Sequence, residues 1–389
     1  MNIRRFTTFA FVLAIVTLIA GLSACDQIGQ LLIPATPQTE GLSGEIPIGV
    51  VLPITGRLAA IGLRMGEGFE LAREEINRSR PSNVRIKFII EDDETAVEGA
   101  VGAFNKLIHQ DGVPAILGPA SSSAARETFP IAQQNGVVAL SPTSGASGLS
   151  AIGDFVFRAS LTADVVIPNS VKVTHAKLGY QRVVTIVDSV ELVARNSDKV
   201  WQESLTANGV EILTTEVFQS GDTDLSEQLN RIKDLNPDAI FISALPTDMP
   251  DMMIQARELG IPYSIPFIVA QVSADEVRAA GDAAEGLITS ASWLSTADTP
   301  GNQVFVQNYT EKYGVEPSIW AAQSYASVYI LAEAIANAQS TDSTAIRDAM
   351  ANLSDFDTVL GKFSFNAVGD TVYDPIMLIV KDGEFHAFK

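Results

Sequence analysis

The body of the chain alternates short apolar runs with longer stretches that have the spacing of amphipathic helices. IPIGVVLP (46–53) is a candidate first strand, and VRIKFII (84–90) is apolar at every second position, as a half-buried strand is. Between them, apolar residues recur every three or four positions, on one face of a helix: Ile61, Met65, Phe69, Ala72 and Ile76. The same spacing recurs before a third predicted strand, PAILG, at Val97, Val101, Phe104 and Ile108.

Glycine marks the predicted joints between helices and strands. It stands after a helical stretch and before an apolar run in HQDGVPAIL, QQNGVVAL, TANGVEIL and RELGIPYS. Glycine readily adopts the left-handed conformation that ends helices. Repeated returns from helix to strand predict βαβ units, whose strands pair in parallel.

The alternation starts a second time after the Gly- and Ser-rich passage SPTSGASGLSAIGDFVFRAS (141–160). Five further strands are predicted there: RVVTIVD, VEILTTEVF, AIFISAL, PFIVA and LITSASW. We therefore predict an α/β fold with two Rossmann-like lobes, each built on a parallel sheet, and a cleft between them. The first lobe is predicted to comprise residues 46–160 and 293–363, and the second residues 161–292 and 364–389.

The first 45 residues do not share this alternation. Arg4 and Arg5 precede the apolar stretch FTTFAFVLAIVTLIAG, which is too short to span a bilayer comfortably. Leu22-Ser23-Ala24-Cys25 then resembles the lipobox of bacterial lipoproteins, which implies cleavage before Cys25 and lipidation of its thiol. We predict a signal peptide over residues 1–24, and a lipidated cysteine with a flexible tether over 25–45. The acyl chains would hold the protein to the membrane on its extracytoplasmic side. An ordinary signal peptide is the alternative.

Composition and charge exclude some partners. Of the 389 residues, 47% are apolar and 19% charged, which suits a globular protein with a large core. The net charge is −20, from 46 acidic and 26 basic residues, with no basic cluster. Such a surface repels nucleic acid, so we expect no nucleic-acid partner.

Hydroxyl-bearing turns follow two neighbouring predicted strands. ILGPASSS places Ser121 and Ser122 where a strand ends and a helix begins, and VVALSPTSG places Thr143, Ser144 and Gly145 after the next strand. The first amides of a helix are unpaired and lie at the positive end of its dipole, which suits a carboxylate or a similar polar head. Helix capping by one serine is the alternative.

The turn after the first strand, LPITGRLAAIG, adds the apolar Ile61 to this end of the sheet. Ligands of open parallel sheets bind beyond the carboxyl ends of the strands. Two polar turns and one mainly apolar turn therefore predict a site for a small amphiphile.

Together these motifs resemble those of the type I periplasmic binding proteins, in the leucine/isoleucine/valine-binding family. Three further segments are similar to that family: SGDTDLSEQLNRIK, GDAAEG and YTEKYGVEPSIWAAQSYASV. The resemblance implies two α/β lobes joined by three hinge crossovers, which close on a small-molecule solute and deliver it to the permease subunits of an ABC transporter. It implies no enzymatic activity, metal or cofactor.

The resemblance also implies site residues. Ser122 takes the place of the ligand-binding serine, and the Thr143–Gly145 turn supplies backbone and hydroxyl contacts. From the second lobe, Leu192 stands where amino-acid binders usually have an aromatic, Gln271 stands where they have an acid, and Leu245 closes from the same side. A neutral amide offers an ammonium no countercharge. We therefore predict a ligand with a polar or anionic head and an apolar body, with an α-amino acid as the alternative.

Two acids, Asp188 and Asp248, follow predicted strands and are candidates to replace the missing countercharge. Two other function classes stay open. A secreted hydrolase would need a nucleophile with a base in reach. The chain has only three histidines as candidate bases, and no Gly-x-Ser-x-Gly motif around a serine nucleophile. The acid run Glu91–Glu94 is interpreted as a solvated strand end. A ligand-sensing or cell-wall-enzyme-activating lipoprotein of the same fold is the other alternative.

Overall fold

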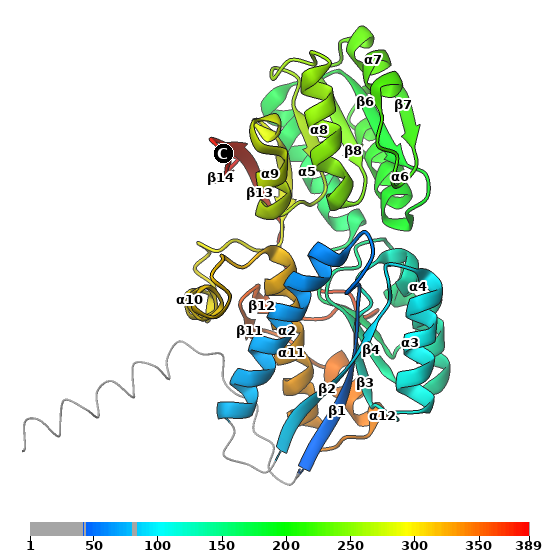
Figure 1. The fold of residues 1–389 in the computed structure, drawn as a ribbon, viewed down its shortest axis with the longest axis vertical. Coiled ribbons are helices and arrows are strands. Elements are labelled where there is room, and N and C mark those ends of the chain that lie inside the picture. The colour runs from blue at the N-terminus through cyan, green and yellow to red at the C-terminus, as the bar shows by residue number, and fades with distance from the viewer. Residues whose placement is uncertain (1–41, 43, 80–83, 389) are drawn as a thin grey trace, which may run out of the picture.

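The chain forms two α/β units stacked along the long axis of the molecule, each around its own sheet (Figure 1). The computed structural model describes residues 42, 44–79 and 84–388. The predicted signal peptide, Cys25 and nearly all of the tether lie outside the described residues. The first strand already begins at Gly44, within the last residues assigned to the tether.

The first unit is built on a sheet of parallel strands in the order β2-β1-β3-β4-β5. The strands are β1 (Gly44–Leu52), β2 (Val84–Asp92), β3 (Ala115–Leu117), β4 (Val138–Ser141) and β5 (Val156–Arg158). The helices between them are α2 (Ala59–Ser79), α3 (Val97–His109), α4 (Ser122–Asn135) and the short η1 (Ser150–Ile152). The apolar face predicted for α2 is buried throughout.

The second unit has the sheet order β14-β13-β10-β9-β8-β6-β7. Its parallel strands are β6 (Arg182–Asp188), β7 (Glu211–Phe218), β8 (Ala239–Ser243), β9 (Phe267–Val269) and β10 (Ile288–Ala291). They alternate with α5 (Ala163–Leu178), α6 (Leu192–Ala207), α7 (Ser226–Leu235), η2 (Pro246–Asp248), α8 (Met249–Glu258), α9 (Ala274–Ala280) and η3 (Gly281–Ala284). All five strands predicted for this half of the chain are present.

The last two strands of the second unit add two antiparallel pairs to its otherwise parallel sheet. β13 (Ile376–Lys381) pairs antiparallel with β10, and β14 (Glu384–Ala387) pairs antiparallel with β13. Asp382 and Gly383 join them with φ angles of 52° and 76°, the positive values that a tight hairpin turn requires. A two-residue turn reverses the chain at once and leaves no room for the helical crossover of a parallel pair.

The chain crosses between the units three times: after β5, after β10, and before β13. Between the second and third crossings it returns to the first unit and forms α10 (Asn302–Tyr313), α11 (Ile319–Ala338), α12 (Ser343–Ala351) and the hairpin β11 (Phe356–Thr358) and β12 (Gly361–Phe363). The α/β fold with two sheet-based units and three crossovers is therefore confirmed.

Helices cover both faces of each sheet. In the first unit, α2 and α11 bury one face and α3 and α4 the other (Figure 1). In the second, α7, α8 and α9 cover one face and α5 and α6 the other. Among the described residues, no helix is both long and apolar enough to cross a membrane.

The contact between α2 and α11 depends on Gly68. A Cβ at this position would lie 2.2 Å from the carbonyl oxygen of Ala321, so the two helices would have to separate. We expect Gly68→Ala to lower the free energy of unfolding by about 1–3 kcal/mol, the cost of overpacking. Urea unfolding followed by circular dichroism measures this change.

Gly102→Ala is the matched control, because Gly102 also lies inside a helix, α3, but has no atom within 4 Å of the added Cβ. There the gain in helix propensity should stabilise the chain by up to about 1 kcal/mol. Equal effects at the two positions would contradict the account of helix packing.

Candidate ligand-binding site

A cavity of about 110 Å³ lies between the two units, beyond the carboxyl ends of their strands. The turn after β1, the start of α4 and the turn after β4 line it from the first unit, and residues of α6, η2 and the ends of β8 and β9 line it from the second. A single buried water molecule needs roughly 10–15 Å³ of cavity volume. The cavity therefore has room for a small solute of about ten non-hydrogen atoms.

The start of α4 forms one wall of the cavity. Ser121 caps the helix, because its Oγ accepts a hydrogen bond from the amide of Ala124 at 3.0 Å. Ser122 is the first residue of the helix and is 2% exposed, and its Oγ accepts from the amide of Ala146 at 3.1 Å. Capping thus belongs to Ser121, whereas the Ser122 hydroxyl keeps its proton available to donate.

The two hydroxyl-bearing turns meet, as the sequence predicts. Thr143 donates from Oγ1 to the carbonyl of Ala120 at 2.9 Å, and Ser141 donates to the carbonyl of Pro119 at 2.7 Å. Thr143 lines the cavity together with Gly145 and with Ile61 of α2. These bonds fix the second turn against the first.

Ser144 does not line the cavity, although it lies between two residues that do. Ser144 is 1% exposed, and its backbone carbonyl accepts hydrogen bonds from Ser160 and Arg158. These bonds hold the backbone of the turn to the neighbouring strand end. Ser144 therefore supports the turn and is not part of the cavity wall.

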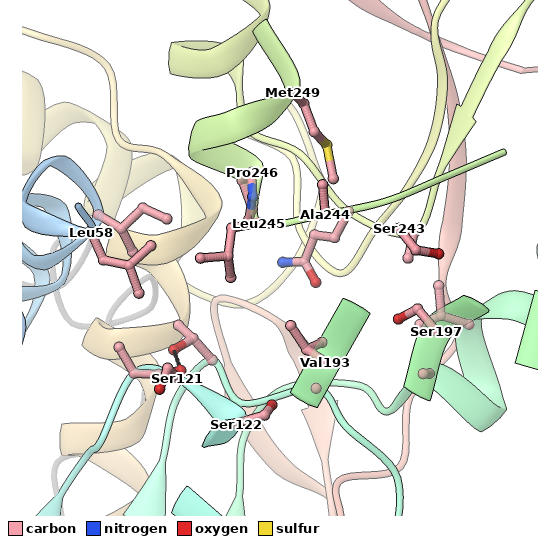
Figure 2. A pocket seen from close by; sticks show the side chains of 18 of the residues that line it. Leu58, Ser121, Ser122, Val193, Ser197, Ser243, Ala244, Leu245, Pro246 and Met249 are labelled. Carbon is pink, nitrogen blue, oxygen red and sulfur yellow. Dashed lines mark hydrogen bonds between the residues drawn. The ribbon is translucent and has the colours of Figure 1, made fainter. Parts of the chain in front are cut away.

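The second unit supplies the opposite wall, on which Leu245 and Gln271 lie as predicted. Leu192 does not line the cavity. Its amide donates to Ser123 Oγ at 3.1 Å, and its side chain packs against the core of the first unit. Val193, the next residue of α6, lines the cavity in its place. Figure 2 shows Val193 between Ser121 and Ser122 at the start of α4 on one side and Ser197 on the other. Val193 and Ser197 both belong to α6.

The sequence did not point to three polar residues of the wall: Trp320, Ser243 and Ser197 of α6. Trp320, near the start of α11, is 5% exposed, and its Nε1 makes no hydrogen bond within the described residues. Ser243 is the last residue of β8 and is 2% exposed, with an equally unpaired Oγ. The position of Ser243 at a strand end was the signal that could have indicated it, as it did for the turns after β3 and β4.

No described residue that lines the cavity carries a charge. The two candidate countercharges are engaged outside it. The carboxylate of Asp188 accepts from the amide of Val190 at 2.9 Å and from Ser220. Asp248 pairs with Arg57 at 3.5 Å, and burial raises its pKa to about 6, against the opposing effect of Arg57. Neither carboxylate replaces the missing countercharge on the cavity wall.

Charged groups instead close the cleft around the cavity. Arg57 of the first unit pairs with Glu191 of the second at 2.9 Å, and Glu191 also accepts from Ser123 Oγ at 2.9 Å. Arg64 of α2 pairs with Asp275 of α9 at 3.0 Å. The units therefore contact each other across the cleft.

The acid run at the end of β2 is structural, but it is not simply solvated. Asp92 accepts hydrogen bonds from the amides of Ile54 and Thr55 at 2.9 and 3.2 Å, which shape the turn after β1. Asp93 is 3% exposed and accepts from the amide of Thr95 at 2.9 Å. Among the residues described, no cluster of His, Cys, Asp and Glu is arranged to hold a metal ion.

Known proteins share this architecture. A family described as periplasmic binding protein matches residues 45–381. The leucine-, isoleucine-, valine-, threonine-, and alanine-binding protein of Pseudomonas aeruginosa is 22% identical over 337 residues, which cover 85% of this chain and 89% of that protein.

Two solved structures are similar over most of their length. The branched-chain amino acid transporter substrate binding protein LivJ of Streptococcus pneumoniae, in complex with isoleucine, has a TM-score of 0.82 at 28% identity, covering 88% of this chain and 98% of LivJ. An ABC transporter solute binding protein from R. palustris, in complex with benzoate, has a TM-score of 0.81 at 22% identity, covering 89% and 96%.

The relatives named above are binding proteins, and the R. palustris protein is a solute binding protein of an ABC transporter. The family match therefore favours a solute-binding protein over the hydrolase alternative. The match spans both sheet-based units and all three crossovers between them. The chain belongs to the periplasmic binding protein family, as a type I member related to the leucine/isoleucine/valine-binding proteins.

Proposed function

We propose that the protein captures a small carboxylic acid with an apolar body outside the cytoplasm and delivers it to the permease of an ABC importer. One observation carries the proposal. The cavity presents the start of α4 and the Ser122 hydroxyl to an anion, but none of the described residues that line it offers a carboxylate to an ammonium.

The anion would bind at the positive end of α4, a helix of 14 residues. The first amides of a helix have no partner within it, and the dipole adds a favourable interaction with negative charge. Ser122 Oγ and the Gly145 backbone lie on the same wall. Backbone donors of this kind hold a carboxylate without a buried cation.

An α-amino acid would bring an ammonium into a closed cavity with neutral walls. A buried charge without a partner is costly. At the position where the family resemblance implies the acid of amino-acid binders, Gln271 offers an amide instead. The benzoate complex of the R. palustris protein illustrates that this fold can hold an acid without an ammonium.

The apolar body of the ligand would contact side chains from both units, such as Ile61 and Leu58 from the first and Leu245 and Met249 from the second. Figure 2 shows Leu58 and Leu245 facing the same space. A ligand that touches both units only when they are closed binds the closed form more tightly. Its binding therefore shifts the population towards closure.

Calorimetric titration of the full-length chain tests the proposal with three matched ligands: leucine, 4-methylpentanoate and 4-methyl-2-oxopentanoate. The two acids keep the carboxylate and the branched body of leucine but lack its ammonium. We expect at least one acid to bind about tenfold more tightly than leucine, a difference of about 1.4 kcal/mol. Tighter binding of leucine than of either acid would refute the proposed ligand class.

Ser122→Ala tests the contact to the carboxylate. Loss of a hydroxyl that bonds a charged group in a dry cavity should weaken binding of the tightest acid by about 1–3 kcal/mol. Ser343→Ala is the control, because Ser343 bonds the carbonyl of Pro114 at the other end of β3 and should leave the affinity unchanged. An unchanged dissociation constant for Ser122→Ala would mean that this hydroxyl only supports the turn at Ala146.

The proposal includes the lipid anchor at Cys25 and an importer as partner. Cys25→Ser should abolish incorporation of a fatty-acid label and release the protein from the membrane fraction.

Deletion of the gene should abolish uptake of the labelled acid that binds tightest. Normal uptake in the deletion strain would argue against transport as the role of this protein.

A further inference from the structure

The wall of the cavity that belongs to the second unit carries polar groups without partners. Ser243 Oγ and Gln271 Nε2 are both inaccessible to solvent and make no hydrogen bond within the described residues. Ser197 of α6 lines the same cavity and is 5% exposed. An unpaired buried polar group costs about 1–3 kcal/mol, and native proteins satisfy nearly all of them. A ligand group is the natural partner for these atoms.

These groups lie apart from the proposed carboxylate site. Figure 2 shows Ser197 and Ser243 near each other on one side of the cavity and Ser121 and Ser122 on the other, with Val193 in between. The wall is thus polar at the start of α4 and again at the end of β8, with the apolar Val193 between these two places. A solute with a single polar head would leave the second polar end unsatisfied.

We infer that the natural ligand is an acid with a second, uncharged hydrogen-bonding group at its far end, held by Ser243 and Ser197. This inference rests on the proposed function, which places the carboxylate at α4. A hydroxyl, a carbonyl or a carboxamide fits the donors and acceptors of two serine hydroxyls.

The second group is uncharged because, within the part of the chain that the structure describes, no charged side chain lines the cavity. A second carboxylate would have no cation to pair with. An amine would need an acid, and the nearest in sequence to Ser197, Asp198, does not line the cavity and accepts from Gln202 at 2.6 Å. Hydroxyl-bearing ligands therefore fit this end better than dianions or amino acids.

Titration calorimetry on the full-length chain tests the inference with acids of three to eight carbons, each plain and with a terminal hydroxyl, and with benzoate and 4-hydroxybenzoate. We expect at least one hydroxylated acid to bind about five- to a hundredfold more tightly than its plain counterpart. The corresponding terminal amines and diacids should bind more weakly than the hydroxylated acid.

Ser243→Ala provides the matched variant. It should reduce the preference for the hydroxylated acid over the plain acid to about twofold or less. Because it removes an unpaired buried group, it should also leave the ligand-free chain at least as stable as the unmodified protein. Ser343→Ala should keep the full preference.

The outcomes separate the two claims. If plain acids bind but no terminal hydroxyl improves binding, the second polar end is refuted and the proposed function stands. If an acid with a terminal amine binds most tightly, the inference that the second group is uncharged is refuted. If leucine binds and none of the acids does, the proposed function fails and this inference fails with it.

Discussion

Replacing Arg158 by leucine should lower the free energy of unfolding by about 3–5 kcal/mol, the cost of breaking a buried ion pair from one side. The side chain of Arg158 is fully buried at the end of β5. Its Nη2 lies 2.6 Å from Asp370 Oδ1, and its Nε lies 2.9 Å from Ser150 Oγ. Without the guanidinium, the largely buried carboxylate of Asp370 would have no countercharge.

Arg158 also holds the turn that lines the cavity. Its Nη1 donates to the carbonyls of Ser144 and Ala146, next to Gly145. Asp370 belongs to the segment of the third crossover, so this ion pair joins the binding turn to the connection between the units. We therefore expect Arg158→Leu to weaken ligand binding as well.

Urea unfolding of Arg158→Leu, Asp370→Leu and the double variant measures these effects. The double variant should lose less stability than the two single variants together, because an apolar pair leaves no buried charge unpaired. Lys87→Leu is the surface control: Lys87 and Glu45 are 62% and 61% exposed, and their pair should contribute at most about 1 kcal/mol. A loss below about 1 kcal/mol for Arg158→Leu would contradict the structural role of the buried pair.

The second large effect is a dependence on pH at Asp93. Burial raises the pKa of this carboxyl from 3.8 to about 6, against a hydrogen bond from the amide of Thr95. At a pH between 3.8 and about 6, the Asp93 carboxyl holds a proton in the folded chain but has released it in the unfolded chain. The contribution of Asp93 to stability is therefore most favourable below pH 4 and is lost as the pH rises to about 6, by about 3 kcal/mol at 1.36 kcal/mol per pKa unit.

Asp93→Asn removes this titration and keeps an oxygen to accept from Thr95. The stability of the variant relative to the unmodified chain should rise between pH 4 and pH 6.5 and stay constant above. Asp92→Asn is the neighbouring control with the opposite sign. Although burial alone would raise the pKa of Asp92, hydrogen bonds from Thr55, Glu94 and Ile54 lower it. A stability difference for Asp93→Asn that does not change with pH would refute the account.

Periodicity and glycine joints predicted most of the fold, because burial on one face leaves a regular pattern. All four joint glycines are left-handed, although Gly260 is followed by a turn and β9 begins only at Phe267. The pattern was less informative for α3. There Phe104 is buried as predicted, but its neighbours in the core are Ala100, Ala103 and Leu107, since the helix packs through small residues.

Three of the short strands were not predicted from the sequence. β5 has three residues in a passage rich in Gly and Ser, and β11 and β12 are equally short. Such strands hold too few residues for an alternation to be visible. They are fixed by tertiary contacts, such as the pairing of β5 with β4 and the buried Arg158.

The candidate site was predictable where strand ends carry it. Ser121, Ser122, Thr143 and Gly145 come together because parallel strands end at one edge of the sheet. Leu192 and Val193 could not be told apart, since the rotation of α6 depends on its bonds to the first unit, such as that from the Leu192 amide to Ser123. Trp320 reaches the cavity only because the chain returns to the first unit after the second crossover.

The most direct test of the account is a crystal structure of the chain with the acid that binds tightest. We predict that its carboxylate oxygens lie within hydrogen-bonding distance of Ser122 Oγ and of the first amides of α4, with the apolar body between Ile61 and Leu245. A carboxylate bound at the wall of the second unit, or a ligand outside this cavity, would contradict it.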